Sequence, residues 1–512
     1  MIFRLQKRLR TIVLTSNFRE LIEDQDNIRA NLIDIRKTMK DDKQRKALAY
    51  ELAGDFSAFT ELLQHEDPKV RKNAVRILGD MECDDLCEAV WDAYRREETL
   101  FVKADYLKAL TQIECRELLP QMKECLTSLI SLEIKPEEEK HISEEISVLQ
   151  KLILKYDGGK GHRFTGYDRS RDVILMVNRN HREATRSQIA EEDVKMMSSG
   201  IRVHTENLKD LLGIRTYSEI LFCVPGMPLL EGTPEKIAKT VISARLTDFL
   251  DDDHSGSGPY CFRTDVRGIK DPDEKTAFIK KISRAVEKES GRRLVNSPSG
   301  YEIEMRFVAG KSGKYVLLIK LFTVPDTRFI YRKEVLPTSI APVNAALIME
   351  LAGDYLREGA QVLDPFCGTG TMLIERFRKV PCSSVYGLDI LEEAILKARR
   401  NTELAHLNFN YINRNYFDFR HEYRFDEIVS NMPAAGRTRD QGAVRELYGR
   451  FLARSREILK DEAVLILCTT LPEILKQCLA GEEQYTIEQE HVLNERDGST
   501  MMIVSYHGGE IK

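Results

Sequence analysis

A ligand-binding loop is predicted between residues 362 and 371, which read Val-Leu-Asp-Pro-Phe-Cys-Gly-Thr-Gly-Thr. The apolar run that ends at Asp364 predicts a strand, and Gly368 and Gly370 predict a tight turn before a helix. Glycine adopts positive φ and lets a ligand approach the backbone, and a strand, glycine turn and helix hold nucleotide-like ligands in doubly wound sheets. A bare structural turn is the alternative interpretation.

A second carboxylate strengthens the ligand interpretation. Asp389 ends the next apolar run, 384–388, and stands 25 residues beyond Asp364, where a carboxylate can accept both ribose hydroxyls. The third glycine of the dinucleotide fingerprint is absent, because Thr-Met-Leu follows Gly370. A cofactor without phosphates therefore fits better. S-adenosylmethionine has a ribose, an adenine and an amino acid part, and Asp364 could face its ammonium group.

A third candidate is Asn431, which ends the predicted strand 427–431 and is followed by Met432 and Pro433. Ligands of open α/β sheets bind beyond the carboxyl ends of the strands. There an Asn side-chain carbonyl and a neighbouring backbone carbonyl could accept both hydrogens of an exocyclic NH2 group and hold its nitrogen lone pair toward a methyl sulfonium. The alternative is a loop in which Asn431 caps the next turn.

The elements that must position these residues form an α/β domain, predicted over 328–512. Helical stretches such as 392–403 and 442–459 separate five predicted strands, which are 362–364, 384–389, 409–413, 427–431 and 463–468. Strands joined by helices favour right-handed crossovers and a parallel sheet. The runs 485–493 and 500–505 instead flank a short Asp-Gly turn, which predicts a closing antiparallel hairpin, the arrangement of class I methyltransferases.

An α+β module is predicted over 163–327, after a glycine-rich linker at 157–162. Its segment 263–293 holds ten Lys or Arg against six Asp or Glu, and includes Lys280 and Arg284. Such a stripe can face nucleic-acid phosphates, although a solvated helix face is the alternative. The position of the module directly before the cofactor domain favours the nucleic-acid role.

Residues 1–156 are predicted to be all-helical and repetitive. The pattern at 70–79 recurs 32 residues later at 102–110, which resembles short HEAT-like repeats. Such a domain is a docking surface for a protein partner or a packed accessory domain, and the sequence does not separate the two. No catalytic constellation occurs in it.

Composition bounds the remaining possibilities. The chain has 512 residues, of which 42% are hydrophobic and 31% charged, as in an ordinary soluble protein, and its net charge of −5 does not by itself indicate a nucleic-acid binder. We find no membrane-spanning run and no signal-peptide core, so a cytoplasmic location is expected. The ten cysteines include no Cys-x-x-Cys pair, so reduced thiols without a disulfide framework or metal site are expected.

The loop at 364–371 resembles motif I of the THUMP-domain RNA methyltransferases. Arg-Phe-Ile-Tyr-Arg at 328–332 and Ser-Ile-Ala-Pro at 339–342 are similar to the segment that precedes that motif in the family. The likeness covers about 165–512. It implies a ferredoxin-like and THUMP module that binds structured RNA, either tRNA or rRNA, and a class I domain that methylates a base, commonly at guanine N2.

The resemblance also implies roles for individual residues. Asp364, Gly368 and Gly370 would line the methionine end of S-adenosylmethionine, and Asp389 its ribose. Asn415 stands where an Asp usually contacts adenine. The other implied cofactor contacts are Phe366, Thr371, Ile390, Tyr416 and Asn431; the implied substrate contacts are Met432, Arg437, Arg332, Lys280 and Arg284; and the catalytic pair is Asn431 and Pro433.

The fourth-strand motif departs from the family pattern of Asn-Pro-Pro followed by an aromatic residue. Met432 replaces the first proline and Ala434 the aromatic ring, and loss of the ring would weaken base capture unless Tyr416, Phe417 or Tyr448 substitutes. The main alternative is therefore a catalytically inactive RNA-binding adaptor that keeps the methyltransferase fold. A methyltransferase acting on DNA adenine or protein is a third interpretation, but it does not explain the THUMP-like module.

Overall fold

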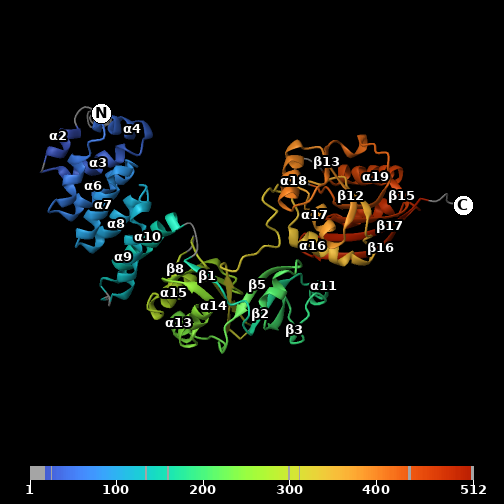
Figure 1. Ribbon diagram of the computed structural model, residues 1–512, viewed down its shortest axis with the longest axis horizontal. Coiled ribbons are helices and arrows are strands. Elements are labelled where there is room, and N and C mark those ends of the chain that lie inside the picture. The colour runs from blue at the N-terminus through green and yellow to red at the C-terminus, as the bar shows by residue number, and fades with distance from the viewer. Residues whose placement is uncertain are drawn as a thin grey trace. The chain divides into compact units, whose positions relative to one another are not determined.

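The computed structural model describes residues 18–24, 26–132, 135, 137–157, 161–297, 300–310, 312–435 and 440–508. Figure 1 shows the helices and strands coloured by residue number. Internal contacts divide the chain into two units. The first unit comprises Met1–Thr165, Gly226–Leu317 and Leu321–Thr323, and the second comprises Gly166–Pro225, Leu318–Lys320 and Val324–Lys512. The three-domain division expected from the sequence stays a prediction.

The described residues between 18 and 157 are helical, as expected. The α-helices are α2 (Phe18–Glu23), α3 (Ile28–Thr38), α4 (Asp42–Leu52), α5 (Ser57–Glu61), α6 (Pro68–Asp80), α7 (Cys87–Arg96), α8 (Leu100–Leu110), α9 (Leu119–Ser131) and α10 (Glu139–Asp157). Helices α6 and α8 contain the two copies of the repeated pattern and pack on each other so closely that a Cβ on Gly79 would lie 2.7 Å from the Cα of Ala109. The HEAT-like character of this region stays a prediction.

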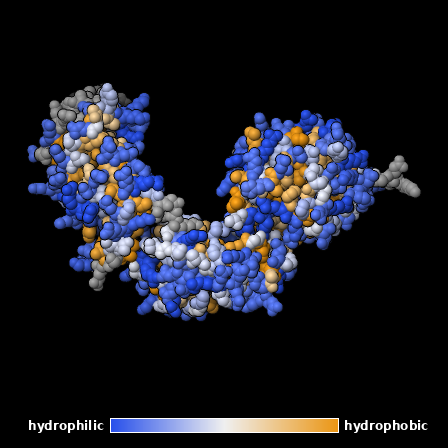
Figure 2. Space-filling model, viewed as in Figure 1, coloured by the Kyte–Doolittle hydropathy of each residue, from blue (hydrophilic) through white to orange (hydrophobic). Residues whose placement is uncertain are grey.

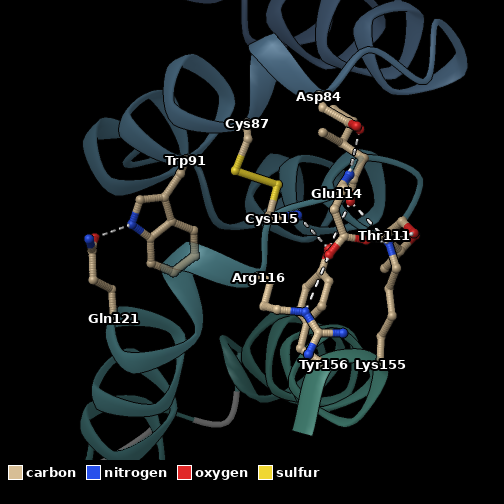
Figure 3. The surroundings of a disulfide bond; sticks show 11 residues. Asp84, Cys87, Trp91, Thr111, Glu114, Cys115, Arg116, Gln121, Lys155 and Tyr156 are labelled. Carbon is tan, nitrogen blue, oxygen red and sulfur yellow. Dashed lines mark hydrogen bonds and ion pairs between the residues drawn. A yellow bond between two sulfur atoms is a disulfide. The ribbon is translucent and has the colours of Figure 1, made fainter. Parts of the chain in front are cut away.

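A disulfide joins Cys87, at the start of α7, to Cys115, with their Cα atoms 5.7 Å apart (Figure 3). The backbone N–H of Cys115 also donates to the hydroxyl of Tyr156 on α10, at 2.7 Å. The expectation that all ten cysteines are reduced is therefore wrong for this pair. The two cysteines are 28 residues apart and no spacing motif marks them, because packing of the helices brings them together.

The rest of the first unit is α/β. Its elements are β1 (His162–Phe164), α13 (Pro234–Ser243), α14 (Leu246–Asp253), β6 (His254–Gly256), β7 (Tyr260–Arg267), α15 (Pro272–Glu289), β8 (Leu294–Asn296) and β9 (Ile303–Ala309). Strand β7 lies between β8 and β9 and is parallel to both, while β1 pairs with β6 in an antiparallel ladder. The linker predicted at 157–162 is shorter than expected at both ends, because Asp157 is the last residue of α10 and His162 is the first of β1. Residues 158–160 lie outside the described residues.

The second unit begins with an antiparallel sheet in the order β3-β4-β2-β5-β10. Its elements are β2 (Arg171–Val177), α11 (Arg182–Arg186), β3 (Val194–Met196), β4 (Gly200–Thr205), α12 (Leu208–Leu212) and β5 (Tyr217–Cys223). Strand β10 (Tyr315–Leu321) contributes its residues 318–320 to this unit. The central strands β2 and β5 are rich in β-branched, aliphatic and aromatic residues, which favour a pleated, buried surface.

The C-terminal sheet has the order β13-β12-β11-β14-β15-β17-β16. Its elements, with the preceding helix α16, are α16 (Pro342–Leu351), β11 (Ala360–Asp364), α17 (Thr371–Lys379), β12 (Cys382–Asp389), α18 (Glu392–Leu404), β13 (Asn410–Asn413), β14 (Phe425–Asn431), α19 (Gln441–Ile458), β15 (Leu459–Thr469), α20 (Pro472–Leu479), β16 (Tyr485–Asn494) and β17 (Ser499–His507). The first five strands are parallel, and β17 is antiparallel to both of its neighbours. The predicted parallel sheet with a closing hairpin is confirmed.

Two apolar layers cover this sheet, because successive strand residues point to opposite faces. Val362 packs in the layer that contains α16, α17 and α18, and the next residue, Leu363, packs in the layer of α19 and α20. The parallel connections bring the carboxyl ends of β11, β12 and β14 to one edge of the sheet. None of the helices in the described part of the chain is long and apolar enough to cross a membrane.

Candidate active site

The glycine loop lies between β11 and α17, and both of its glycines have positive φ, 51° at Gly368 and 79° at Gly370. A Cβ on Gly370 would overlap the phenol of Tyr411 on β13, so packing alone requires glycine there. A Cβ on Gly368 would meet no atom within 4 Å. The loop is therefore packed beneath Gly370 and open at Gly368, which leaves room for a ligand against the backbone.

Asp389, at the end of β12, contacts this loop directly. Its Oδ2 accepts a hydrogen bond from the N–H of Gly368 at 3.1 Å, and its Oδ1 accepts one from the N–H of Leu391 at 2.9 Å. The N–H of Cys367 donates to the carbonyl of Leu388 at 2.9 Å. The structure thus brings together the two sequence features that were predicted to share one ligand.

Asp364 lies behind the loop and is almost fully buried. Its Oδ1 accepts hydrogen bonds from the hydroxyl of Ser430 at 2.6 Å and from the N–H of Phe366 at 3.0 Å. Burial is the largest influence on this carboxyl and raises its pKa to about 7, although both hydrogen bonds favour the charged form. A cation bound next to Asp364 would stabilise its ionised form.

Thr371, the first residue of α17, carries a polar atom without a partner. Its hydroxyl is buried, and no hydrogen bond engages it within the described part of the protein. Buried polar atoms in folded proteins are nearly always paired, so this hydroxyl, three residues after Gly368 in the chain, is a candidate for a ligand contact. Ile390, the residue after Asp389, is 65% exposed. An exposed apolar side chain of this kind can pack against the face of an adenine ring. Figure 2 shows that hydrophobic residues also occur on the visible surface of the C-terminal region.

Asn415 and Tyr416 follow β13, at the start of the short 3-10 helix η5 (Tyr416–Asp418). The Oδ1 of Asn415 accepts from the N–H of Phe417 at 3.1 Å, so its amide nitrogen is the group that could reach a ligand. The ring of Tyr416 is buried against Phe366, and its hydroxyl is 2.9 Å from that of Ser455. That ring belongs to the core, which leaves only the backbone of Tyr416 for the predicted cofactor contact.

Asn431 is half-buried at the end of β14. The next residue, Met432, is buried and donates its N–H to the carbonyl of Cys468 on β15 at 2.8 Å. The carbonyl of Pro433 accepts a hydrogen bond from the hydroxyl of Tyr448 on α19 at 2.9 Å. Ala434 is exposed, and no hydrogen bond from the described residues engages the side-chain amide of Asn431. Because Tyr448 is buried with its hydroxyl bonded, it does not replace the missing ring by stacking.

The predicted substrate residues are spread over both units. Arg332 donates from Nη2 to the carbonyl of Ile340 at 3.3 Å, and its buried Nε has no hydrogen-bond partner among the residues that the structure describes. Lys280 and Arg284 are exposed on α15, in the first unit. Arg437 lies outside the described residues. Within the described ranges, no cluster of three His, Cys, Asp or Glu side chains could hold a metal ion.

Sequence reasoning missed the contacts that hold α17 in place. Glu375 accepts two hydrogen bonds from Arg215, at 2.7 and 2.8 Å, and one from Tyr331 at 2.6 Å. The adjacent Arg376 donates two hydrogen bonds to Glu427 on β14, at 2.6 and 2.8 Å. The signal that could have indicated these partners is the position of Glu375 and Arg376 directly after the apolar run 372–374, because charged residues are rarely buried unless they are paired.

Comparisons with known proteins find a family model and curated relatives that match part of this chain. Residues 330–502 match the family model described as RMKL-like, methyltransferase domain. The tRNA (guanine(6)-N2)-methyltransferase of Thermus thermophilus is 34% identical over 154 residues, which cover 29% of this chain and 45% of that protein. The tRNA (guanine(10)-N2)-dimethyltransferase of Methanothermobacter thermautotrophicus is 27% identical over 169 residues, which cover 33% of this chain and 48% of that protein. The chain therefore spans about half the length of these curated relatives.

Among solved structures, the crystal structure of TrmN from Thermus thermophilus has a TM-score of 0.51 and 18% identity, and the match covers 66% of this chain and 99% of that chain. At 18% identity this likeness supports a similar fold and nothing further. The C-terminal sheet, its strand order and the matched segment 330–502 show a class I methyltransferase domain. Its glycine loop, Asp389 and the unpaired Thr371 hydroxyl fit S-adenosylmethionine, the methyl donor of that class.

Proposed function

We propose that this protein is an S-adenosylmethionine-dependent RNA methyltransferase that acts on an exocyclic base amine, with guanine N2 of tRNA as the first candidate. The observation that carries the proposal is the position of Asn431. Its amide stands at the carboxyl edge of the sheet that also presents Gly368 and Asp389. The choice of base and RNA is supported by two relatives whose names specify guanine-N2 methylation of tRNA.

Each part of the cofactor has a matching group in the site. S-adenosylmethionine, when bound, supplies an electrophilic methyl group on a sulfonium. Asp389 would accept the ribose hydroxyls, since each carboxylate oxygen can accept a further hydrogen bond besides those from Gly368 and Leu391. The hydroxyl of Thr371 and the carboxyl of Asp364 would serve the amino acid end. Ile390 and the amide of Asn415 would hold the adenine.

The amine-binding step needs acceptors in a fixed arrangement. The side-chain oxygen of Asn431 and the backbone carbonyl of Met432 would accept the two N–H groups of the target amine and leave the nitrogen lone pair aimed at the methyl carbon. The nitrogen–carbon bond forms as the carbon–sulfur bond breaks, and the extra proton leaves the amine for water. No covalent nucleophile is needed, and burial raises the pKa of the Cys367 thiol, which keeps it protonated.

The remaining parts of the chain would bind the partners. We assign residues 163–327 to a ferredoxin-like and THUMP module that holds tRNA or rRNA, with Lys280 and Arg284 on the exposed face of α15 meeting phosphates. Arg332 and Arg437 would meet phosphates closer to the target base. The HEAT-like assignment of residues 1–156 is supported by the close packing of α6 on α8, and a protein partner would dock there.

A second candidate function is a catalytically inactive RNA-binding adaptor with the methyltransferase fold. The observation that favours it is Ala434, which is exposed and has no ring on which a flipped base could stack. The two candidates differ in what they predict for Asn431: an enzyme needs its amide for turnover, and an adaptor does not.

The test is a methyl-transfer assay with the full chain. The substrates are total tRNA and rRNA from a strain in which the gene has been deleted, together with S-adenosylmethionine labelled in its methyl group. We expect label in tRNA, and nuclease digestion followed by mass spectrometry should identify N2-methylguanosine. Label in another nucleoside would correct the base, and binding of S-adenosylmethionine without any transfer would favour the adaptor.

A further inference from the structure

Three groups form a chain of hydrogen bonds that ends at the loop after Asn431. The N–H of Leu471 donates to the hydroxyl of Thr469 at 2.9 Å, the hydroxyls of Thr469 and Tyr448 are 2.8 Å apart, and the hydroxyl of Tyr448 donates to the carbonyl of Pro433 at 2.9 Å. Tyr448 and Thr469 are both buried, with exposures of 0% and 2%. The chain therefore lies in the protein interior, where such bonds are strong.

The direction of every proton in this chain follows from its last member. A carbonyl oxygen only accepts, so the single hydroxyl proton of Tyr448 is donated to Pro433. The hydroxyl of Thr469 must then donate to Tyr448, and it accepts in turn from Leu471. All three bonds are satisfied at once in only this arrangement.

The loop has few other means of being held at this point. Proline has no N–H, so Pro433 can be held by hydrogen bonding only through its carbonyl. Upstream, the N–H of Met432 is bonded to Cys468. The bonds to Met432 and Pro433 thus flank the Met432 carbonyl, which together with the Asn431 amide forms the acceptor pair assigned to the target amine.

We propose that Tyr448 is a positioning residue for the amine-binding loop, and that the chain Leu471–Thr469–Tyr448 fixes the acceptor pair of Asn431 and Met432. This inference rests on the proposed function for the meaning of the acceptor pair. The need for such a clamp is greater here because Ala434 gives the loop no aromatic ring to pack or to stack on the base. Methyl transfer depends on alignment, and a shift of about 1 Å can reduce the rate about a hundredfold.

The first test measures the clamp without using the reaction. Hydrogen exchange of the full chain, followed by mass spectrometry, is compared for the wild type and Tyr448→Phe, which removes only the hydroxyl. We expect the amide of Met432, which is bonded to the carbonyl of Cys468, to exchange roughly threefold to tenfold faster in the variant. The matched control is Tyr485→Phe, because the Tyr485 hydroxyl is also buried and also donates to a backbone carbonyl, that of Leu452 on α19, but forms no hydrogen bond with the described residues of the loop after Asn431.

The second test separates positioning from folding by kinetics with total tRNA from the deletion strain. In Tyr448→Phe we expect kcat to fall about tenfold to a hundredfold, with KM for S-adenosylmethionine and tRNA within about twofold of wild type. Thr469→Val should lower kcat in the same way because it breaks the chain, and Thr469→Ser should keep the wild-type rate because it retains the hydroxyl.

The outcomes are distinguishable from a failure of the proposed function. If the wild type transfers no methyl group, the proposed function fails, and the exchange rate of Met432 still decides whether Tyr448 clamps the loop. Unchanged exchange in Tyr448→Phe, or a change equal to that in Tyr485→Phe, would overturn the inference. An increase in KM without a decrease in kcat in Tyr448→Phe would also overturn it.

Discussion

Asp389 accepts a hydrogen bond from the backbone N–H of Gly368, with 3.1 Å between Oδ2 and the nitrogen, so the carboxylate at the end of β12 is joined to the glycine loop after β11. In the proposed function this one residue would have two tasks: it accepts a hydrogen bond from the loop, and it would present oxygen atoms to the ribose. Both tasks depend on the carboxylate, because an N–H group needs an acceptor and ribose hydroxyls need acceptors too.

Replacing Asp389 by Ala should abolish cofactor binding. Hydrogen bonds to a charged group contribute about 1.5–3 kcal/mol each, so loss of two ribose contacts should weaken S-adenosylmethionine binding about a hundredfold or more. Isothermal titration calorimetry on the purified full chain measures this. The control is Glu403→Ala, which removes an exposed carboxylate of α18 that forms an ion pair with Arg400 on the same helix, and which should bind like the wild type. Equal affinities in both variants would contradict the ribose assignment.

Asp364 should make the stability of the cofactor domain depend on pH. Its pKa is raised to about 7 in the folded protein, against about 3.9 in an unfolded chain. Between those values the folded protein retains a proton that the unfolded chain has lost, so the free energy of unfolding falls as pH rises, by at most about 1.4 kcal/mol per pH unit. Above about pH 7 this contribution no longer changes.

The test compares the wild type with Asp364→Asn, which cannot titrate, by thermal unfolding at pH 5, 6, 7 and 8 without cofactor. The stability of Asp364→Asn relative to the wild type should increase from pH 5 to pH 7 and then level off. Asp418→Asn, at an exposed position in η5, is the control and should run parallel to the wild type. A constant difference between Asp364→Asn and the wild type would show that this carboxyl does not titrate in that range.

The C-terminal sheet could be predicted from the sequence because its signals are local. An apolar run that ends at Asp364, and another that ends at Asp389, each show a strand and its carboxyl end without knowledge of the neighbours. The contacts between distant side chains could not be predicted. Arg215 and Glu375 are 160 residues apart, and Tyr448 and Pro433 pair through a loop and a helix, so only the folded arrangement shows them. The burial of Tyr416 has the same origin.

The ion pair between Arg376 and Glu427 should be essential for the stability of the domain. Both side chains are almost completely buried, and their two hydrogen bonds join α17 to β14. Removing one partner leaves a buried charge without compensation, which costs about 3–5 kcal/mol. Arg376→Met should therefore be strongly destabilised, and adding Glu427→Leu should restore much of the loss because no charge is then left unpaired.

The measurement is urea unfolding of the full chain, restricted to the transition that S-adenosylmethionine shifts, since that transition belongs to the cofactor domain. Lys379→Met is the control on the same helix. Its ion pair with Glu350 is partly exposed, and such pairs contribute about 0–1 kcal/mol. If Arg376→Met were as stable as Lys379→Met, the buried pair would not hold the two elements together.

Asn431→Ala separates the enzyme from the adaptor. Within the described residues no hydrogen bond engages the side-chain amide of Asn431, so the fold should tolerate its removal. Loss of one positioned hydrogen-bonding group in an active site typically lowers kcat about a hundredfold to a thousandfold. We expect that loss in the tRNA methylation assay, with binding of tRNA and of S-adenosylmethionine retained. The control is Asn410→Ala, because Asn410 lies at the amino end of β13, away from the carboxyl edge of the sheet, and the variant should keep the wild-type rate. A wild-type rate in Asn431→Ala would exclude this residue from the reaction and move the search for the amine acceptors to another part of the sheet edge.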